Sequence, residues 1–473
     1  MRDHIASIIK TINNTETDLY IVGGAIRDFL LNRPIEDIDF VIKNNIKEVV
    51  ENIAHSLKSS YFALDEKRNT YRIHLRDSNL NLDFSQMRGS TIEEDLSMRD
   101  FTINAMAYPI NLGWPIEIDK IIDPSNGKGD LRSKTIRFVR DSAIQDDPIR
   151  IMRAVRFMSQ LEYEVDGQTL KELKKNGHLI TSVVKERIIK ELFLILAEKR
   201  SFFYLNFMDK HIQLLDKIFP DVIEMKCVGE CKYHVVDSWT HSIYTLKMLE
   251  TYIYASSFFE EHIKKAYDEH TSEILAGNRT RLQLLKLGAL FHDIGKPSAR
   301  FEDPDGRVRF RGHEVTGAEI VKKYAEEYML SNKEKSILYR YVLSHMWPLE
   351  LYKKNDVSGK TLYKMFMETG PETLDILLIG LADIVATRRL LDPEEEMGVF
   401  KVHIEYIANN YLTRFKEVEN ISNIFSGKEI METLNIPEGK EVGEVLEKIK
   451  MAIYFAEIPA TKAGIIKFLK SEK

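Results

Sequence analysis

The chain has 473 residues, of which 44% are hydrophobic and 30% charged, and this composition excludes an intrinsically disordered protein. At about 150 residues per domain, the length predicts roughly three domains with a sizeable buried core. The net charge of −6 gives no global case for nucleic-acid binding, so any contact with phosphates needs a local positive surface.

The secondary-structure pattern changes near residue 135. Residues 1–135 alternate helical periods with short β-branched runs such as YIVGG, DIDFVI, TYRIHL and LNLDFS, which predicts a small mixed sheet with helices. From residue 136 onward nearly every segment has helical spacing, so we expect an α+β fold with a helical second part. Between residues 136 and 200, 13 Lys and Arg outnumber 10 Asp and Glu, which allows a positive surface there.

The first residues and the cysteines predict a cytoplasmic protein. The N-terminal MRDHIAS contains no apolar run of signal-peptide length, and no uncharged stretch of about 18 residues follows. The two cysteines, Cys227 and Cys231, lack a second Cys or His pair at zinc-site spacing. We therefore expect two free thiols in a reducing compartment.

Two carboxylates, Asp37 and Asp39, lie inside the apolar run IEDIDFVI. Residues i and i+2 of a strand project to one face, so both carboxylates lie together while Ile38 and Phe40 face the core. Such a pair repels itself unless a cation lies between, and hard oxygen ligands select Mg²⁺ or Mn²⁺. The arrangement suits in-line nucleotidyl transfer, although this spacing alone also fits a turn or a solvated surface.

A glycine pair, Gly23 and Gly24, precedes the two carboxylates between a predicted strand and a predicted helix. Glycines at such a turn permit close approach of the backbone to a phosphate, and Arg27 lies in the first turn of the helix. An ordinary strand–turn–helix with a surface arginine explains the same residues, so the glycines do not decide the function.

Five segments, in order between residues 21 and 192, resemble the motifs of the class II tRNA nucleotidyltransferases and bacterial poly(A) polymerases. They are GGAIRDFLLNRPIEDIDFVI, EEDLSMRDFTINAMAY, DPSNGKGDL, DDPIRIMRAVRF and KERIIKEL. The resemblance implies that Asp37 and Asp39 are catalytic ligands of Mg²⁺. It further implies contacts to the incoming nucleotide from Gly24, Arg27 and Arg99, with Thr102 and Asn104 on the ribose side.

The fourth motif places Asp147, Arg150, Arg153 and Arg156 at intervals of three, which forms a ridge along a helix. An Asp accepts and an Arg donates hydrogen bonds, so together they can pair with the Watson–Crick edge of a base. The resemblance makes Asp147 and Arg150 the protein template that selects CTP and then ATP, with nucleotide or phosphate contacts from Arg153 and Arg156. An exposed ion-pair ridge is the alternative.

Two departures from the family pattern bear on this prediction. Asp146 stands where the family commonly has Glu, which affects the support of the template pair and leaves the pair itself in place. The segment QMRGSTI, between the strand LNLDFS and the second motif, is short, whereas complete CCA-adding enzymes often carry a longer flexible loop there. A short segment is consistent with a partial enzyme that adds only CC or only A.

The second part contains His and Asp residues on successive helical segments, in SWTHSIYTL, ALFHDIGKP, RGHEVTGAEI, VLSHMWP and GLADIVATRR. They resemble an HD domain, which implies a divalent metal site and the hydrolysis of phosphate esters such as 2′,3′-cyclic phosphates. The expected ligands are His241, His292, Asp293 and Asp383, with His313 and His345 as weaker ones that leave room for a second metal. Four further histidines are expected to be core residues: His211, His262, His270 and His403.

The motifs divide the chain into four expected domains: a catalytic head at 1–135, a helical neck at 136–220, an HD domain at 221–400 and a helical tail at 401–473. Residues 426–446 resemble the tail segment that contacts the tRNA body, and a packing helix pair explains them equally well. The expected partners are the 3′ acceptor end of tRNA, CTP and ATP, with no DNA and no membrane.

The expected function is template-independent addition of CMP, AMP or both to the 3′ end of tRNA. Two alternatives remain open: a poly(A) polymerase that uses ATP on RNA 3′ ends, and an HD-domain phosphohydrolase whose head only binds RNA.

Overall fold

The computed structural model describes residues 2–13, 18–66, 69–75, 80–229, 236–391 and 394–471. It divides into two compact units, which we call the first and the second unit. The first unit comprises Met1–Glu191 with Lys210–Lys217, and the second comprises Leu192–Asp209 with Ile218–Lys473. Cys231 lies outside the described residues, and Cys227 is an exposed free thiol.

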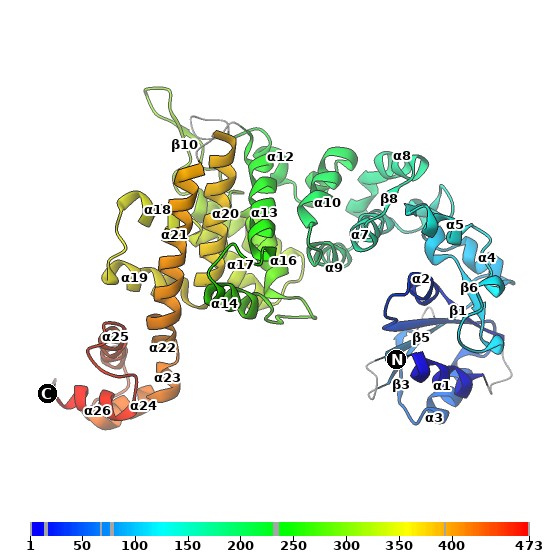
Figure 1. The fold of residues 1–473 in the computed structure, drawn as a ribbon, viewed down its shortest axis with the longest axis horizontal. Helices are drawn as coiled ribbons and strands as arrows, with labels where there is room; N and C mark the ends of the chain where they lie inside the picture. Colours follow the sequence, from blue (N-terminus) through cyan, green and yellow to red (C-terminus); the bar gives the residue numbers. More distant parts are fainter. Residues whose placement is uncertain are drawn as a thin grey trace. The chain divides into compact units, whose positions relative to one another are not determined.

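A six-stranded mixed sheet forms the N-terminal part of the first unit (Figure 1). Its order is β3-β4-β5-β2-β1-β6, and only β2 and β5 pair in parallel. The strands are β1 (Leu19–Val22), β2 (Asp37–Ile42), β3 (Tyr61–Asp65), β4 (Thr70–Leu75), β5 (Leu80–Gln86) and β6 (Ala107–Pro109). The predicted mixed sheet, and with it the α+β fold class, is confirmed.

Helices α1 (Arg2–Ile12), α2 (Gly24–Leu30) and α3 (Ile46–Ser56) accompany this sheet. In α3 the buried residues Ile46, Val49, Val50 and Ile53 recur at helical spacing, and this apolar stripe packs on β3, β4 and β5. The core of the sheet includes the stacked rings of Phe40 and Phe84, whose centroids are 4.9 Å apart.

A short helix, α4 (Ile92–Ser97), follows the sheet's fifth strand and leads to the second motif. Its N-terminus is capped by the Thr91 hydroxyl, which accepts a hydrogen bond from the Glu94 amide. The remaining elements of the first unit are α5 (Gly127–Arg132), β7 (Thr135–Ile136), α6 (Ala143–Asp146), α7 (Arg150–Leu161), β8 (Glu164–Val165), α8 (Gly167–Asn176) and the start of α9 (Lys185–Leu196). The parallel β7–β8 ladder lies partly in the region expected to be all helical, because two residues per strand give too short a pattern to detect.

Among its described residues, the secondary structure of the second unit is helical apart from the short hairpin of β9 (Phe301–Glu302) and β10 (Val308–Arg309). Helices α13 (Ser238–Tyr254), α15 (Arg281–Phe291) and α20 (Thr373–Leu391) pack against one another at its centre (Figure 1). Their apolar residues lie on all sides, as expected for helices buried on every face. Around and after them are α10 (Ser201–Phe207), α12 (Asp221–Met225), α14 (Glu261–Thr271), α16 (His313–Glu327), α17 (Asn332–Ser344), α18 (Trp347–Lys354), α19 (Gly359–Thr369) and α21 (Glu394–Asn410). Helix α11 (Leu215–Ile218) belongs to the first unit except for its last residue.

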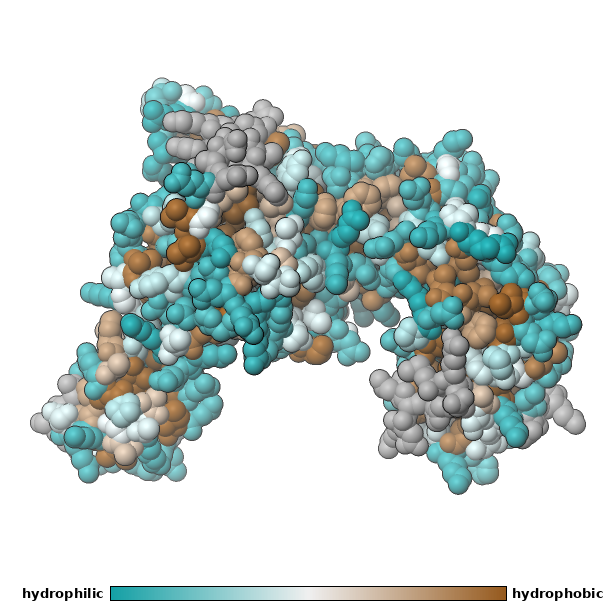
Figure 2. Space-filling model, in the orientation of Figure 1, coloured by the Kyte–Doolittle hydropathy of each residue, from teal (hydrophilic) through white to brown (hydrophobic). Residues whose placement is uncertain are grey.

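Five further helices end the chain: α22 (Lys416–Glu419), α23 (Ile421–Ile424), α24 (Gly427–Leu434), α25 (Lys440–Tyr454) and α26 (Lys462–Ser471). On the face shown in Figure 2, hydrophilic side chains cover most of the surface, and apolar ones form smaller groups. Within the part of the chain that is described, no helix is both long and apolar enough to cross a membrane.

Candidate active site and metal cluster

The acidic pair lies on one face of β2, because the alternate residues Ile38 and Phe40 are buried in the sheet. Asp37 is exposed and accepts a 2.7 Å hydrogen bond from the Asn81 side chain on β5. Asp39 is more buried, and no hydrogen-bond donor among the described residues reaches its carboxylate. Burial raises the pKa of Asp39 to about 6, with Arg99 opposing the shift and the carboxylates of Asp83 and Asp37 adding to it. A buried, partnerless carboxylate beside a second one fits a divalent cation.

A third carboxylate, Asp83, was missed by the sequence analysis. It is the direct neighbour of Asp39 across the parallel β2–β5 pair. Arg72 on β4 donates to both of its oxygens, at 2.6 and 2.7 Å. The signal was a charged residue between buried Leu82 and Phe84 in β5, but no sequence pattern shows which neighbouring strand supplies the partner. Asp83 therefore lies beside the acidic pair, and its carboxylate adds to the rise in the pKa of Asp39.

Gly23 provides the turn that brings β1 to this site. Its φ of 71° lies in the region that favours glycine. A Cβ atom here would lie 3.3 Å from Arg99 Nη1 and 3.5 Å from Asp39 Oδ2. The turn therefore leaves free the space between an arginine and the more buried carboxylate. Gly24 begins α2, and a Cβ there would lie 3.5 Å from Arg27 Nη2.

Arg27 and Asn104, predicted from separate motifs, meet in the structure. Arg27 Nη1 donates to Asn104 Oδ1 at 2.8 Å, while Nε and Nη2 bind the Asp28 carboxylate at 2.9 and 2.8 Å. Asn104 in turn donates to Asp100 at 3.5 Å. Thr102 differs, because its buried hydroxyl donates to Asp130 at 2.7 Å, so it is used inside the protein.

Phe157 lies at the centre of an arginine group that comes from α2 and α7. The guanidinium carbons of Arg27, Arg153 and Arg156 are 5.3, 5.5 and 4.5 Å from its ring centre. We call these four residues the Phe157 cluster. Two carboxylates balance it: Asp100 accepts from Arg153 Nε at 2.8 Å, and Glu191 lies 3.2 Å from Arg156 Nε.

The charges of the Phe157 cluster are partly desolvated. Burial works to raise the pKa of Asp100, but the Arg153 charge and hydrogen bond outweigh it and lower that pKa. Burial lowers the pKa of Arg156 to about 10, so it still carries its charge at neutral pH. Arg99 is held separately by Asp95, at 3.0 and 3.1 Å. The arrangement keeps several cations ordered in one place, as binding a triphosphate requires.

The two predicted template residues have different surroundings. Arg150 is buried, and its Nη1 and Nη2 donate to the backbone carbonyls of Ala143 and Met98 at 3.1 and 3.0 Å. Asp147 is partly exposed, and its two oxygens accept from Arg187 Nη1 and Nη2 at 3.1 and 2.7 Å. Asp147 Oδ1 also accepts from the Ile149 amide at 3.4 Å. Both side chains are therefore oriented by hydrogen bonds, Arg150 by backbone carbonyls and Asp147 mainly by another side chain.

A second cluster lies in the second unit, where the predicted HD-type residues come together. His241 is on α13, His292 and Asp293 directly follow α15, and Asp383 is on α20. Two groups could each hold a metal ion, with their ligand atoms within 4.8 Å of one another. These groups are His241, His292 and Asp383, and Asp293, His313 and His345. All six residues are buried. Asp293 lies near both groups, because its Oδ2 is 3.3 Å from His292 Nε2 and its Oδ1 is 3.2 Å from His313 Nε2.

The histidine rings of this cluster are oriented in one way. In His292, His313 and His345, Nδ1 hydrogen-bonds the backbone carbonyl three residues earlier, at 2.8, 2.8 and 2.7 Å. A carbonyl accepts only, so Nδ1 carries the proton and Nε2 presents its lone pair to the centre. His292 Nε2 is buried and has no hydrogen-bond partner. These nitrogen and carboxylate donors fit a divalent transition metal.

Electrostatics in the cluster also fit a bound cation. Burial lowers the pKa of His345 to about 3, so this ring is neutral, as a metal ligand must be. Although burial alone lowers the pKa of His292, the Asp293 and Asp383 carboxylates raise it to about 10. A site that favours positive charge this strongly binds either a proton or a metal ion there.

The four histidines expected in the core behave differently from one another. His270 is partly buried and bonds Asp375 at 2.8 Å, and His403 bonds the Pro348 carbonyl at 3.2 Å. His211 and His262 are exposed, which corrects the prediction. Both lie on the polar side of their helical segments, where apolar neighbours in the sequence do not imply burial.

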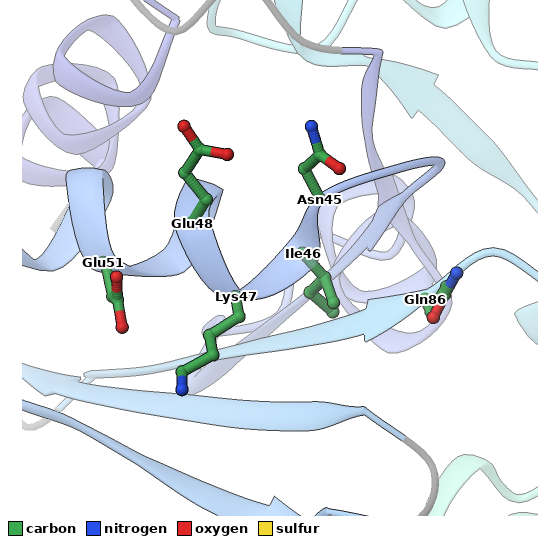
Figure 3. A pocket seen from close by; sticks show the side chains of 6 residues that line it. All are labelled: Asn45, Ile46, Lys47, Glu48, Glu51 and Gln86. Atoms are coloured by element: carbon green, nitrogen blue, oxygen red, sulfur yellow. The ribbon is translucent and has the colours of Figure 1, made fainter.

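One open depression of the first unit lies away from the acidic pair. It has a volume of about 510 Å³ and is lined by Asn45, Ile46, Lys47, Glu48, Glu51 and Gln86 (Figure 3). Gln86 is opposite Ile42, at the other end of β2 from Asp37. At about 3.3 Å per residue this separation is roughly 15 Å, so the depression is not part of the candidate active site.

Comparison with protein families places the two sites in known domains. Residues 19–137 match the profile described as "Poly A polymerase head domain", and residues 238–388 match "HD domain". Residues 162–225 match "Probable RNA and SrmB- binding site of polymerase A". The chain thus carries a poly(A) polymerase head domain, the RNA-binding segment that goes with it and an HD domain. The acidic pair and the arginines thus lie in or directly after the head domain, and the histidine cluster lies in the HD domain.

Individual relatives differ in how much of the chain they match. A CC-adding tRNA nucleotidyltransferase from Thermus thermophilus is 27% identical over 92% of this chain and 89% of its own length. An A-adding enzyme from Deinococcus radiodurans is 26% identical over 93% and 92%. A CC-adding enzyme from Geobacter sulfurreducens is 35% identical, but the match spans only 44% of either chain.

Solved structures share the fold. A Thermotoga maritima CCA-adding enzyme complexed with tRNA is 22% identical, with a TM-score of 0.61 over 99% of this chain and 95% of that one. A CCA-adding enzyme in complex with CTP is also 22% identical, with a TM-score of 0.63 over 99% and 94%. At this identity the likeness establishes the fold and leaves the activity to be argued from the site.

Proposed function

We propose that this chain adds CMP, AMP or both to the 3′ end of tRNA without a nucleic-acid template. The observation that carries the proposal is the acidic pair of β2, which lies beside a glycine turn and Arg99. The names of the relatives support the reaction and the substrate: the first-named relatives are CC-adding and A-adding tRNA nucleotidyltransferases.

Asp37 and Asp39 would hold Mg²⁺, which supplies the charge that activates the terminal 3′-hydroxyl of the RNA and stabilises the leaving pyrophosphate. Arg99 and the three arginines of the Phe157 cluster bind and orient the triphosphate of the incoming nucleotide. The hydroxyl attacks the α-phosphate, and the bond to the β-phosphate breaks. Arg150 donates to the base and Asp147 accepts from it, a pattern that fits cytosine and adenine.

The length of the product shows whether the protein adds one, two or three nucleotides. The short segment between β5 and α4 and the five CC-adding relatives favour addition of CC over complete CCA synthesis. A poly(A) polymerase would use ATP alone and extend many RNAs. Recognition of tRNA should depend on the shape and phosphates of the acceptor arm.

The test is extension of three tRNA substrates, ending before CCA, in C-C and in C-C-A, with each labelled nucleotide and Mg²⁺. We expect addition of one to three nucleotides by the wild type. Asp37→Ala should lower the rate by on the order of 1,000-fold, because it removes a principal source of transition-state electrostatics. Asp119→Ala, an exposed aspartate of the same unit, is the matched control. Undiminished extension by Asp37→Ala would refute the assignment.

We further propose a phosphohydrolase activity for the HD domain, because six His and Asp ligands form two adjacent groups and backbone carbonyls fix three of the four rings. The substrate class is a phosphate ester such as a 2′,3′-cyclic phosphate. Protein stripped with chelator and reloaded with Mn²⁺, Co²⁺, Ni²⁺ or Zn²⁺ should release phosphate only after reloading. Hydrolysis by no metal form would leave the cluster a structural one and refute this activity.

The four-domain division at residues 135, 220 and 400 and the cytoplasmic location remain predictions from the sequence. The tail at residues 401–473 is proposed to contact the tRNA body.

A further inference from the structure

Arg187 lies next to the proposed template. It belongs to the fifth motif, KERIIKEL, for which the sequence predicted no role. It lies in the first turn of α9 (Lys185–Leu196), 40 residues after Asp147, in the same compact unit. Its Nη1 and Nη2 bind the two oxygens of the Asp147 carboxylate separately, at 3.1 and 2.7 Å. This two-point arrangement fixes the plane of the carboxylate as well as its position.

An aspartate carboxylate turns freely about its last side-chain bond, because that torsion has a broad, shallow energy profile. A carboxylate that reads a base must keep one lone pair directed at the exocyclic amino group. A planar guanidinium bound through two nitrogens prevents the rotation, whereas an ammonium group acts as a point charge and does not. Each carboxylate oxygen has two acceptor positions. Oδ1 accepts from Arg187 and, at 3.4 Å, from the Ile149 amide, whereas Oδ2 accepts from Arg187 alone and keeps one position for a base.

The other half of the template is oriented by a different means. Arg150 is buried and donates to the carbonyls of Ala143 and Met98, so the backbone holds it. These bonds use two of its five N–H groups, and the Asp146 carboxylate lies 3.6 Å from Nη1. The donor half is thus held mainly by the main chain, whereas the plane of the acceptor half is held through both oxygens by the Arg187 side chain.

We propose that Arg187 is a positioning residue that determines nucleotide specificity by fixing the acceptor plane of Asp147. This rests on the proposed nucleotidyltransferase function. Cytosine and adenine present an amino donor beside a ring acceptor, whereas uracil and guanine present a carbonyl beside a ring N–H. A fixed Asp147 therefore repels uracil and guanine, and a rotating one discriminates less.

A structural role for this pair would have a different signature. The Arg187 side chain is 49% exposed and that of Asp147 is 33% exposed. Ion pairs at this exposure contribute little to folding, so removal of Arg187 should leave the melting temperature nearly unchanged. Discrimination between nucleotides is the quantity that should change.

The experiment compares Arg187→Ala, Arg187→Lys and Lys190→Ala with the wild type. Lys190 is exposed on the same helix, and its removal changes the net charge equally. For each protein, kcat and KM are measured for CTP, UTP, ATP and GTP on tRNA lacking CCA and on tRNA ending in C-C. The measure of discrimination is kcat/KM for CTP divided by that for UTP, or kcat/KM for ATP divided by that for GTP. For the nucleotide that the wild type adds, this ratio should fall roughly tenfold or more in Arg187→Ala.

Arg187→Lys should recover only part of this ratio, because one ammonium cannot hold the plane, and Lys190→Ala should match the wild type. An unchanged ratio in Arg187→Ala, with extension still measurable, would overturn the proposal. So would full recovery by Arg187→Lys, which would assign the effect to charge alone. If the wild type extends no tRNA, the proposed function itself fails, and that result is distinct from either outcome.

Discussion

The acidic site of the head and the histidine cluster of the HD domain both place carboxylates close together, but the two sites differ in how far their charged groups are buried and in what they are paired with. In the head, Asp37 is exposed, Asp39 is partly buried, and nearby cations are paired with Asp28, Asp95, Asp100 and Glu191. In the HD domain, six ligands are buried together, and backbone carbonyls fix three of the rings. The head therefore keeps ion pairs that substrate phosphates can replace. The HD ligands have buried partners instead: His241 Nε2 lies 2.8 Å from Asp383 Oδ1, and Lys296 Nζ lies 2.5 Å from Asp293 Oδ2.

This difference fits what the two sites are proposed to bind. A site that accepts and releases a nucleotide at every turnover needs charges that are ordered yet accessible. A resident metal ion needs a desolvated, closed donor set whose orientation does not change. The second unit also contains a buried ion pair that is separate from the metal ligands, Lys286 with Glu250.

The first prediction concerns this buried pair, for which we expect the largest effect on stability. Lys286 Nζ lies 2.8 Å from Glu250 Oε1 and also donates to the carbonyls of Leu196 and Glu198, at 2.9 and 2.6 Å. Both side chains are almost fully buried. Lys286→Met leaves the buried Glu250 carboxylate with hydrogen bonds from Ser201 and Phe202 but without its cation, so it should lower the free energy of unfolding by about 3 kcal/mol. Urea unfolding monitored by circular dichroism measures this value.

The control is Lys264→Met, which breaks an exposed pair with Asp268 in the same unit and should cost at most about 0.5 kcal/mol. The double variant Lys286→Met, Glu250→Leu should regain part of the loss, since it leaves no buried charge. A loss for Lys286→Met as small as that of the control would contradict the contrast between buried and accessible charges.

The second prediction tests whether the two sites act independently. Asp293→Asn removes a carboxylate that lies beside both metal-binding groups, so the protein should lose on the order of 100-fold or more in affinity for its HD metal. Metal content by mass spectrometry and tRNA extension are measured on the same sample. We expect loss of metal with extension retained, because the head has its own ligands. Loss of extension in a folded variant would show that the sites depend on each other.

The contiguous parts of both sites could be predicted from the sequence. The period of two in DIDFVI places Asp37 and Asp39 on one face, and the structure shows Ile38 and Phe40 buried behind them. The six HD-type residues also meet, although they are up to 142 residues apart, and this was predicted by the resemblance to an HD domain and not by helical periodicity.

Contacts between distant segments could not be predicted. Arg72 binds Asp83 across two strands, and Arg187 binds Asp147 over 40 residues of sequence. Periodicity shows which face of an element a residue occupies and says nothing about the side chain opposite it. The incorrect burial of His211 and His262 has a related cause, because the direction of a helix face is fixed by its neighbours in space.

The third prediction has the smallest effect and uses the pKa of Asp39, which burial raises from 3.8 to about 6. Below pH 4 this group is protonated in both the folded and the unfolded protein. Between pH 4 and 6 the unfolded protein loses the proton first, so a stability cost develops and is complete above pH 6. Because the side chain retains some solvent contact, we expect Asp39→Asn to stabilise the metal-free protein by about 1–2 kcal/mol at pH 8 and by almost nothing at pH 4.

Melting temperatures in chelator at both pH values measure this, with Asp119→Asn as an exposed control. Added Mg²⁺ should reverse the order at pH 8, because only the wild type gains stability from a cation at the acidic pair. If the two proteins melt alike at pH 8 with and without Mg²⁺, Asp39 carries no desolvation cost, and the argument that its environment is built for a cation fails.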